Sequence, residues 1–177
     1  MNKRLMRTNL LAPIFLMLIT AGTAFADTPN RDIRYQIIAK HSGKCLDIAG
    51  GELYNGAAAI QWDCHGGDNQ QWTFEPAGGG YFKIIVKHSG KALDVFGGIF
   101  SAGSGVVVQQ RDYNGSTNQI WSVTDLGNGY YSIVARHSNK ALEIKDGSTG
   151  NGASAQQNDY MSGANHQQWR LTPRPCR

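Results

Sequence analysis

The feature that most constrains this chain is a segment that it repeats three times. HSGKCLDI begins at His41, HSGKALDV at His88 and HSNKALEI at His137, so the copies lie 47 and 49 residues apart. A tryptophan follows each copy at a matched distance: Trp72, Trp121 and Trp169. Repeats of this length indicate supersecondary units that cannot bury their apolar faces alone. We therefore expect three units to share one core.

Each unit shows the alternation of apolar and polar residues that is typical of β-strands. The first strand of each unit has apolar residues at alternate positions: Tyr35, Ile37 and Ala39; Phe82, Ile84 and Val86; Tyr131, Ile133 and Ala135. Between the first and second strands, each unit has a pair of residues that favour a turn: Ser42-Gly43, Ser89-Gly90 and Ser138-Asn139. Because Gly and Asn tolerate positive φ, we predict a tight hairpin at each of these points.

The second strand of each unit places an acidic residue between two apolar ones. Since the apolar neighbours face the core, we expect Asp47, Asp94 and Glu143 to face outward. A third strand is predicted over residues 60–63, 107–112 and 155–159, and a fourth strand carries the tryptophan. In the first unit we expect Asn69 and Trp72 to share that fourth strand. Four strands, three times, predict an all-β closed architecture about a pseudo-threefold axis, with the tryptophans in its core.

The two ends of the chain differ in composition from the repeats. Three basic residues, Lys3, Arg4 and Arg7, precede an apolar run and the triplet Ala-Phe-Ala at 24–26, which predicts a secretory signal over 1–26. We therefore expect a secreted or periplasmic protein that does not span a membrane. Residues 27–33 read as an N-terminal extension, 34–173 as one domain with repeats at about 34–80, 81–129 and 130–173, and 174–177 as a tail.

Charge and cysteine content limit which kinds of partner and which disulfides the chain can have. The signal holds three of the 17 Lys and Arg and none of the 13 Asp and Glu, so the remainder is near neutral and we expect no nucleic-acid partner. In an oxidising compartment Cys45 and Cys64 can pair, which leaves Cys176 over. We predict the Cys45–Cys64 disulfide. Two roles stay open for Cys176: a free thiol, or a link to a partner protein or a second copy.

Three Gln-x-Trp motifs carry a resemblance to a known family. They are Gln70-Gln71-Trp72, Gln119-Ile120-Trp121 and Gln167-Gln168-Trp169, and the first unit adds KCLDI and WDC. In these motifs the chain resembles the ricin B-type lectins over essentially all of its length after the signal. The resemblance implies a β-trefoil of twelve strands that binds carbohydrate, with one shallow site in each unit. It also implies a disulfide between the cysteines of KCLD and WDC.

The resemblance further implies which residues contact sugar: the acid after KCL, an aromatic side chain on the third strand and the Asn before the glutamine. A carboxylate accepts hydroxyl donors, an amide both donates and accepts, and a flat ring covers the apolar face of a pyranose. The first unit has the full set, with a supporting Gln and a nearby His: Asp47, Trp62, His65, Asn69 and Gln70.

The other two units keep less of this set. In the second unit the acid, the Asn and the Gln remain, Arg111 occupies the aromatic position, and a tyrosine two residues later is a substitute: Asp94, Tyr113, Asn118 and Gln119. The third unit has Glu143 for Asp, Asn158 at the aromatic position and His166 where Asn is expected, with Tyr160 as a substitute ring. We interpret the third unit as scaffold.

Other repeated polar residues invite a catalytic or metal-binding interpretation, which we weigh against structural roles. His41, His88 and His137 precede tight turns, where bonding to the local backbone is expected rather than metal binding. The aspartates at matched turns are assigned the same role: Asp63, Asp112 and Asp159. No serine, cysteine or carboxylate pair forms a recognisable catalytic motif, so we predict neither enzyme activity nor a cofactor.

The sequence therefore favours a glycan-binding lectin with its strongest site in the first unit. A single shallow sugar site is expected to have a Kd of about 1 mM. Useful affinity would come from several sites of the protein that bind one galactose-type glycan or polysaccharide together. Two alternatives stay open, because a fold does not fix a function. The trefoil could recognise a protein, as an inhibitor or interaction subunit, or it could be the binding subunit for a separately encoded toxin or glycosidase.

Overall fold

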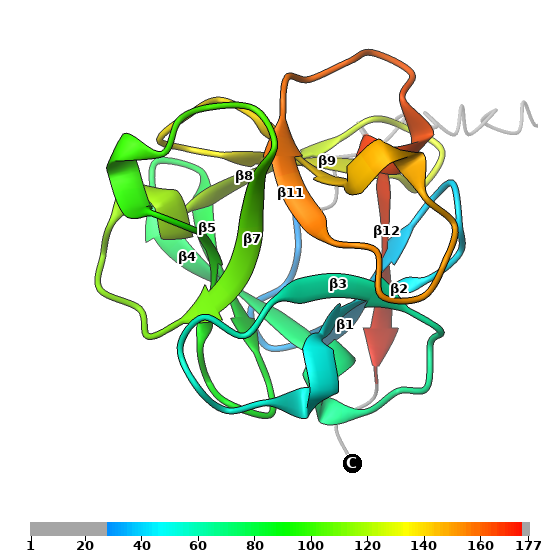
Figure 1. The fold of residues 1–177 in the computed structure, drawn as a ribbon, viewed down its shortest axis with the longest axis horizontal. Helices are drawn as coiled ribbons and strands as arrows, with labels where there is room; N and C mark the ends of the chain where they lie inside the picture. The colour runs from blue at the N-terminus through cyan, green and yellow to red at the C-terminus, as the bar shows by residue number, and fades with distance from the viewer. Residues whose placement is uncertain (1–27, 175–177) are drawn as a thin grey trace, which may run out of the picture.

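The computed structural model describes residues 28–174, which form twelve strands in three lobes of four (Figure 1). The strands are β1 Arg34–Ala39, β2 Cys45–Ile48, β3 Ala59–Trp62, β4 Trp72–Gly78, β5 Tyr81–Val86, β6 Ala92–Val95, β7 Val106–Arg111, β8 Trp121–Asp125, β9 Tyr131–Ala135, β10 Ala141–Ile144, β11 Ala155–Asn158 and β12 Trp169–Arg174. The predicted signal and Cys176 lie outside these residues. Within 28–174 we find no helix with the length and apolar character needed to cross a bilayer.

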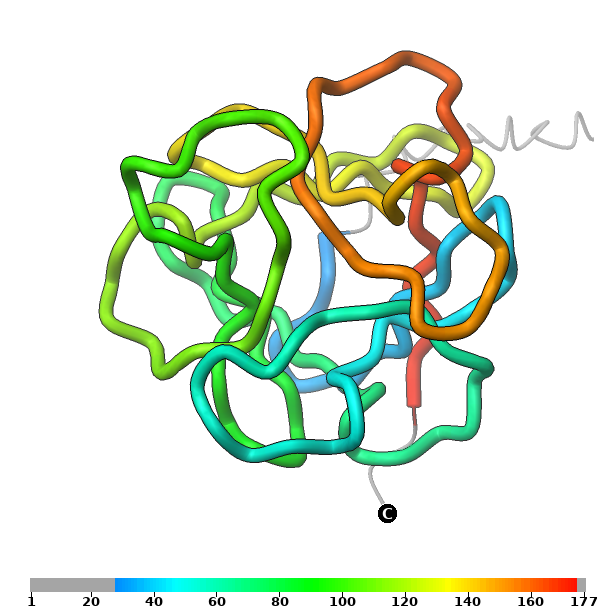
Figure 2. The backbone as a smooth tube through the Cα atoms, in the orientation of Figure 1, coloured from blue at the N-terminus to red at the C-terminus, as the bar shows by residue number. Residues whose placement is uncertain are grey.

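Six strands, the first and last of each repeat, close into a barrel. β1 pairs with β4, and the ring continues through β5, β8, β9 and β12 back to β1. The middle strands form three hairpins, β2–β3, β6–β7 and β10–β11, which meet over one end of the barrel (Figures 1 and 2). This arrangement is a β-trefoil, which confirms the closed threefold architecture predicted from the repeats and the fold that the resemblance to the ricin B-type lectins implies. The hairpin turns contain Gly43, Gly90 and Asn139, all with positive φ.

The three tryptophans lie at equivalent places in the core. Trp72, Trp121 and Trp169 are fully buried among the apolar residues of all three repeats. Each indole Nε1 donates a hydrogen bond to the carbonyl of the leucine in the second strand of its own repeat, at 3.0–3.1 Å. Because the indole N–H is satisfied, the ring can be buried without leaving an unpaired donor. Each indole thus joins the barrel to its hairpin.

Short 3₁₀ segments, which periodicity did not predict, interrupt each repeat twice. They are η1 Ala49–Gly51, η2 Asp68–Gln70, η3 Gly98–Phe100, η4 Thr117–Gln119, η5 Lys145–Gly147 and η6 Asn165–Gln167. The expectation that Asn69 shares a strand with Trp72 is wrong: Asn69 lies on η2, and β4 begins at Trp72. Runs of three residues are too short to show a helical period.

The acidic residues of the second strands do not face solvent, contrary to expectation. Asp47, Asp94 and Glu143 are 3%, 2% and 2% exposed. They do point away from the barrel core, but the 3₁₀ segments fold over them and supply amide donors. Burial of an acid is tolerated where hydrogen bonds satisfy its oxygens.

The repeated His residues bond backbone, as predicted, but the backbone belongs to a neighbouring repeat. His41 Nε2 contacts the carbonyl of Ser148 at 2.8 Å, and His88 and His137 make the equivalent contacts with the preceding repeat. Gln61, in the first repeat, donates to the carbonyls of Ser148 and Gly150 in the third. Gln110 and Gln157 likewise each donate to two carbonyls of the repeat that precedes their own. These bonds link the three lobes in a cycle.

The aspartates after the third strands also differ from expectation. Asp63, Asp112 and Asp159 lie one residue beyond their strands, and each carboxylate accepts a hydrogen bond from a lysine of its own hairpin: Lys44, Lys91 and Lys140. Each also accepts a bond from the preceding repeat in the cycle, from Asn151, Asn55 and Ser104 respectively. Sequence spacing identifies the residues but not which lobe lies beside them.

Candidate functional site

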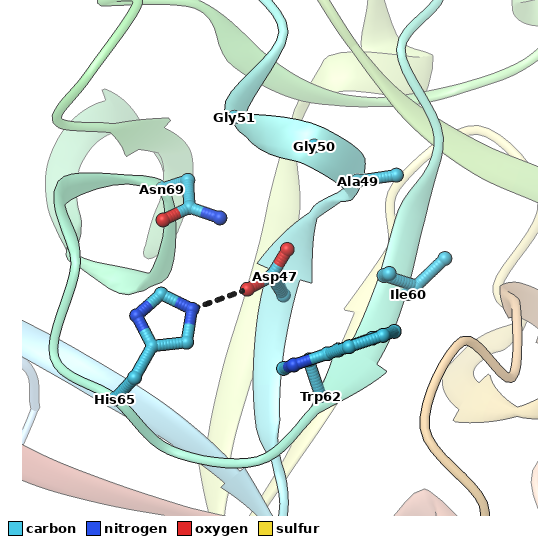
Figure 3. Close-up of a pocket in the computed structure, with 8 residues that line it drawn as sticks. All are labelled: Asp47, Ala49, Gly50, Gly51, Ile60, Trp62, His65 and Asn69. Atoms are coloured by element: carbon cyan, nitrogen blue, oxygen red, sulfur yellow. Dashed lines mark ion pairs between the residues drawn. The ribbon is translucent and has the colours of Figure 1, made fainter.

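The first repeat contains a cavity of about 500 Å³ at the open side of its β2–β3 hairpin (Figure 3). Four segments line it: the end of β2, η1, β3 with the loop after it, and η2. The lining residues are Asp47, Ala49, Gly50, Gly51, Ile60, Trp62, His65 and Asn69. Of the five site residues expected in this repeat, the cavity brings together four, and the fifth, Gln70, lies directly behind them, fully buried.

Asp47 forms the floor of this cavity and has one oxygen free of internal bonds. Its Oδ2 accepts a hydrogen bond from Gln70 Nε2 at 2.8 Å and lies 3.4 Å from His65 Nε2. Among residues 28–174 no close hydrogen bond ends on Oδ1, although the Asn69 side-chain amide lies near enough to act on this carboxylate as a donor. Burial raises the pKa of Asp47 above its ordinary value, although Gln70, His65 and Asn69 act in the opposite direction. The unoccupied Oδ1 is an acceptor that a ligand hydroxyl can use.

Gln70 holds the loop that carries His65. Its Oε1 accepts hydrogen bonds from the backbone N–H of His65 and Gly66, and its Nε2 donates to Asp47 and to the carbonyl of Asp63. The disulfide Cys45–Cys64 adds a covalent tie between β2 and the residue before His65, which confirms the predicted pairing. The loop is therefore held in two ways: the Gln70 side chain bonds its backbone, and the disulfide ties Cys64 to β2.

His65 and Asn69 are oriented by backbone groups around Gly67. The Gly67 N–H donates to His65 Nδ1 at 3.1 Å, so in the neutral imidazole the proton is on Nε2, which faces Asp47. Asn69 Nδ2 donates to the carbonyl of Ile48 at 3.1 Å. A Cβ at position 67 would lie within 2.8 Å of both side chains, so only glycine allows them to approach this closely.

Trp62, the last residue of β3, provides a flat apolar wall beside Asp47. Its side chain is 43% exposed, whereas the three core tryptophans are fully buried. In Figure 3 the indole lies next to the Asp47 carboxylate, with His65 and Asn69 on the other side. A large exposed ring next to a buried acceptor is a common arrangement for binding a ligand that has one apolar face.

In the second repeat the same positions enclose a cavity of about 340 Å³ with different chemistry. Asp94 is buried, and both oxygens are occupied, Oδ1 by Gln109 Nε2 and Oδ2 by Asn118 Nδ2, each at 2.8 Å. Arg111 stands at the Trp62 position, and Phe96, which the sequence analysis did not single out, forms part of the lining. Gln119 supports the loop through Asn114, as Gln70 does through His65.

Two tyrosines that could have replaced Trp62 lie elsewhere. Tyr113 does not line the second cavity, and the Lys83 ammonium lies 4.9 Å from its ring centroid. Tyr160 lines a separate hollow beside Lys40 and Tyr130. Both tyrosines lie two residues beyond the end of their strand. In this arrangement neither ring lies with the other expected residues of its site, so their role as substitutes for the indole stays a prediction.

In the third repeat the acid is fully engaged by the protein. Glu143 Oε1 accepts bonds from Gln156 and Asn158, and its Oε2 accepts a bond from Gln167 and lies 3.5 Å from His166 Nε2. No acceptor is left for a ligand. The sequence analysis missed one signal of the difference between these acids. The residue paired with the acid across the hairpin is Ile60 in the first repeat but Gln109 and Gln156 in the others.

Comparison with known proteins identifies the family. The model of the ricin-type β-trefoil lectin-like domain matches residues 24–107, 99–158 and 117–175. The chain belongs to this lectin-like family. The matches overlap one another and together cover residues 24–175, which include all of the described residues.

Solved structures agree with this assignment. A designed threefold-symmetric protein, ThreeFoil, is 48% identical, with a TM-score of 0.76, over 78% of this chain and 97% of that one. An exo-β-1,3-galactanase from Clostridium thermocellum is 38% identical, with a TM-score of 0.77, over 84% of this chain but only 32% of the enzyme. A ricin B-like lectin from Macrolepiota procera, solved with lactose, shares the fold at 24% identity and a TM-score of 0.70, over 84% and 100%.

Two further arrangements bear on what this lectin-like domain can do chemically. Residues 28–174 contain no group of three or more His, Cys, Asp or Glu side chains placed to hold a metal ion. Near Asp47, the next carboxylate along the hairpin is Asp63, where a hydrogen bond from Lys44, and a second from Asn151, hold the pKa below its ordinary value. Asp63 does not line the cavity that contains Asp47, and Lys44 and Asn151 occupy its carboxylate.

Proposed function

We propose that this chain is a glycan-binding lectin whose principal site is the cavity of the first repeat. The observation that carries the proposal is the open Oδ1 of buried Asp47 beside the exposed face of Trp62. A sugar hydroxyl donates to Oδ1, and the apolar face of the pyranose packs on the indole. His65 and Asn69 border the same space and add polar contacts at its rim.

The ligand proposed is a galactose-containing glycan. Support comes from the relatives: the galactanase at 38% identity acts on a β-1,3-linked galactan by its name, and the Macrolepiota procera lectin was solved with lactose. One shallow site of this kind is expected to bind with a Kd of about 1 mM. Strength on a polymer or a cell surface would come from several contacts made at once.

The proposal is for binding without catalysis, outside the cytoplasm. Asp63 does not line the cavity, and its carboxylate accepts hydrogen bonds from Lys44 and Asn151, so we propose no catalytic pair with Asp47. The predicted signal over 1–26 supports export, and the Cys45–Cys64 disulfide is compatible with an oxidising compartment. No cofactor is required by this chemistry, and none is proposed.

Calorimetric titration tests the proposal with two ligands, lactose and a β-1,3-linked galactan. The wild-type protein should bind both saturably, and Trp62→Ala should weaken lactose binding about tenfold, because the stacking surface is lost. Tyr160→Ala is the matched control, since Tyr160 is equally exposed at 45% and lies outside the cavity. Lactose binding that survives Trp62→Ala unchanged would exclude this site, and a failure of all galactose glycans to bind would exclude the ligand class.

A second candidate role is to serve as the binding subunit of a larger toxin or glycosidase. The chain aligns with only 32% of the galactanase, and with 18% of a mosquitocidal holotoxin that shares its fold at 22% identity. Immobilised protein should then capture a partner from the culture medium of its host. A partner that free lactose displaces is itself a glycan ligand, whereas one that lactose does not displace supports the subunit role or a protein-recognising trefoil.

A further inference from the structure

The junction where the first and last strands close the barrel carries two arginines side by side. Arg34 begins β1, Arg174 ends β12, and the two are directly opposite in the register of these strands (Figure 1). The next residue, Tyr35, is buried in the core, so the alternation of the strand places both arginines on the outer face of the barrel. Like charges directly opposite each other on one face of a sheet destabilise it. A bound anion would remove this cost.

The Arg174 side chain lies against the loop that follows β3. A Cβ at Gly66 would be 2.6 Å from Arg174 Nη2, so the guanidinium lies over the backbone of this glycine. His65, the residue before Gly66, lines the first-repeat cavity, whereas neither Arg34 nor Arg174 does. The arginine pair is therefore beside the proposed glycan site and separate from it.

The donors of both guanidinium groups are not used by the protein. Among residues 28–174, neither arginine makes an ion pair within 4 Å or a side-chain hydrogen bond. The acids nearby in the chain are engaged by other cations: Asp32 Oδ1 lies 3.7 Å from Arg31 Nε, and Asp68 accepts a bond from Lys87 at 2.8 Å. Both arginine side chains are partly exposed, so a ligand from solution can reach them.

The equivalent junctions between the other repeats are built differently. Tyr81 and Tyr130 occupy the position of Arg34. In each, a cation of the following repeat in the cycle stacks on the ring: Arg136 Cζ lies 4.8 Å from the Tyr81 centroid, and Lys40 Nζ lies 4.6 Å from the Tyr130 centroid. The equivalents of Arg174, counted from the core tryptophans, are two apolar residues: Ala77 and Leu126. Of the three described junctions, only the one that closes the barrel sets cation against cation.

We propose that Arg34 and Arg174 together bind one oxyanion, the sulfate or phosphate monoester group of an acidic polysaccharide. Each guanidinium presents N–H donors in a planar fork, and a tetrahedral ester has enough oxygens to accept from both forks at once. A carboxylate, with fewer oxygens, satisfies one fork at a time. The choice of a polysaccharide as carrier rests on the glycan-binding role proposed for the first cavity, which adjoins the pair through His65 and Gly66.

Dextran sulfate is the probe, because its glucose chain carries the ester without the galactose proposed for the first cavity. Calorimetry at low ionic strength should show saturable binding of dextran sulfate and no binding of unsulfated dextran. Arg34→Gln and Arg174→Gln should each weaken binding about tenfold, because charge-assisted hydrogen bonds are lost. The double variant should lose little more than either single variant, since both arginines hold the same ester. Losses that multiply would contradict a shared site.

Two further variants separate the site from general charge and from the fold. Arg170→Gln removes an exposed arginine of the same strand that pairs with Ile38 instead of a cation, and it should keep most of the affinity. Arg34→Tyr installs the residue of the other junctions. It should bind as weakly as Arg34→Gln and melt no lower than the wild-type protein. Equal weakening by Arg170→Gln would indicate a diffuse positive field and overturn the proposal.

Competition and vesicle binding identify the anion and its carrier. Sodium sulfate should displace dextran sulfate more effectively than sodium acetate does at equal ionic strength, where screening is the same. Vesicles of phosphatidylcholine with phosphatidylglycerol test a lipid carrier: binding to them through both arginines, without binding of dextran sulfate, would contradict the polysaccharide. Lactose affinity should be unchanged in Arg34→Gln, so this assignment and that of the first cavity can fail separately.

Discussion

The first and third repeats share one framework but treat their acidic residue in opposite ways. Asp47 keeps one oxygen open beside an exposed indole, whereas Glu143 is bonded by three amide side chains, with His166 a further 3.5 Å contact. In both repeats the acid is buried under a 3₁₀ segment that carries the supporting glutamine. Under the proposed function, we expect a buried acid to become a ligand site only where the protein leaves it short of donors.

The second repeat is intermediate and shows which position decides the outcome. The residue paired with the acid across the hairpin is Ile60 in the first repeat, and Gln109 and Gln156 in the others. Each of these glutamines donates to the acid of its own repeat at 2.7–2.8 Å. Isoleucine has no donor, so Asp47 retains an acceptor for an external hydroxyl.

The largest effect expected from this comparison is on stability. Glu143→Ala leaves the buried donors of Gln156, Asn158 and Gln167 without their acceptor, and should lower the free energy of unfolding by about 3 kcal/mol. Asp47→Ala frees only one close donor and should cost about 1 kcal/mol. Denaturant unfolding of the two variants measures both values. Equal losses would contradict the distinction drawn between the two acids.

Asp47→Asn should weaken lactose binding about thirtyfold, because a neutral amide accepts a hydroxyl less strongly than a carboxylate does and loses charge-assisted bonding. Glu143→Gln is the matched control, since it makes the same change at the saturated acid and should leave the lactose affinity as it was. Calorimetry on both variants compares them directly. A loss of similar size in the control would mean that the effect is transmitted through the fold rather than made at the site.

Ile60→Gln converts the first repeat toward the other two. The new amide is expected to donate to Asp47 Oδ1, as Gln109 does to Asp94, and to reduce lactose affinity about fivefold with the fold retained. Ile60→Met has a similar length without an amide and should lose less. If the two variants bind alike, the residue at this position does not control access to the acid.

The smallest effect expected is that of pH on lactose binding, because binding should change little near neutral pH. Burial raises the pKa of Asp47 above 3.8, so lactose binding should be full at neutral pH and decline as the pH falls through that raised value. Hydrogen bonds from Lys44, Lys91 and Lys140 hold the pKa values of the three clasp aspartates, Asp63, Asp112 and Asp159, below 3.8. Their stabilisation is present above the unfolded value and is lost only below it.

The protein should therefore pass through a pH range in which it is folded but no longer binds. Parallel lactose titrations and circular dichroism between pH 7 and about pH 3.5 would locate this range. Simultaneous loss of binding and fold, at one pH, would contradict the opposite shifts assigned to Asp47 and the clasp aspartates.

Much of the fold follows from the sequence, because it depends on features that repeat. Alternation locates the strands, Gly43, Gly90 and Asn139 locate the hairpins, and the matched tryptophans indicate a common core. The links between lobes do not follow in the same way. Each repeated His and Gln bonds a carbonyl of another repeat. Which repeats are neighbours depends on the closure of the barrel, which the sequence pattern does not show.

The site was only partly predictable, for a related reason. Resemblance indicated Asp47, Trp62, His65 and Asn69, and the structure brings these side chains to one cavity. The expectation that the acids face solvent failed because 3₁₀ segments of three residues leave no periodic signal, yet they cover each acid. The exchange of Ile60 for glutamine was visible in the aligned repeats, but its meaning depends on a hydrogen bond that only the hairpin register reveals.

A crystal structure of the protein soaked with lactose tests the central claim most directly. The account predicts a galactose ring packed on the indole of Trp62, with one hydroxyl oxygen about 2.5–2.8 Å from Asp47 Oδ1 and no sugar at Glu143. Sugar bound at the third repeat, or sugar in the first cavity that leaves Asp47 Oδ1 without a contact, would contradict it.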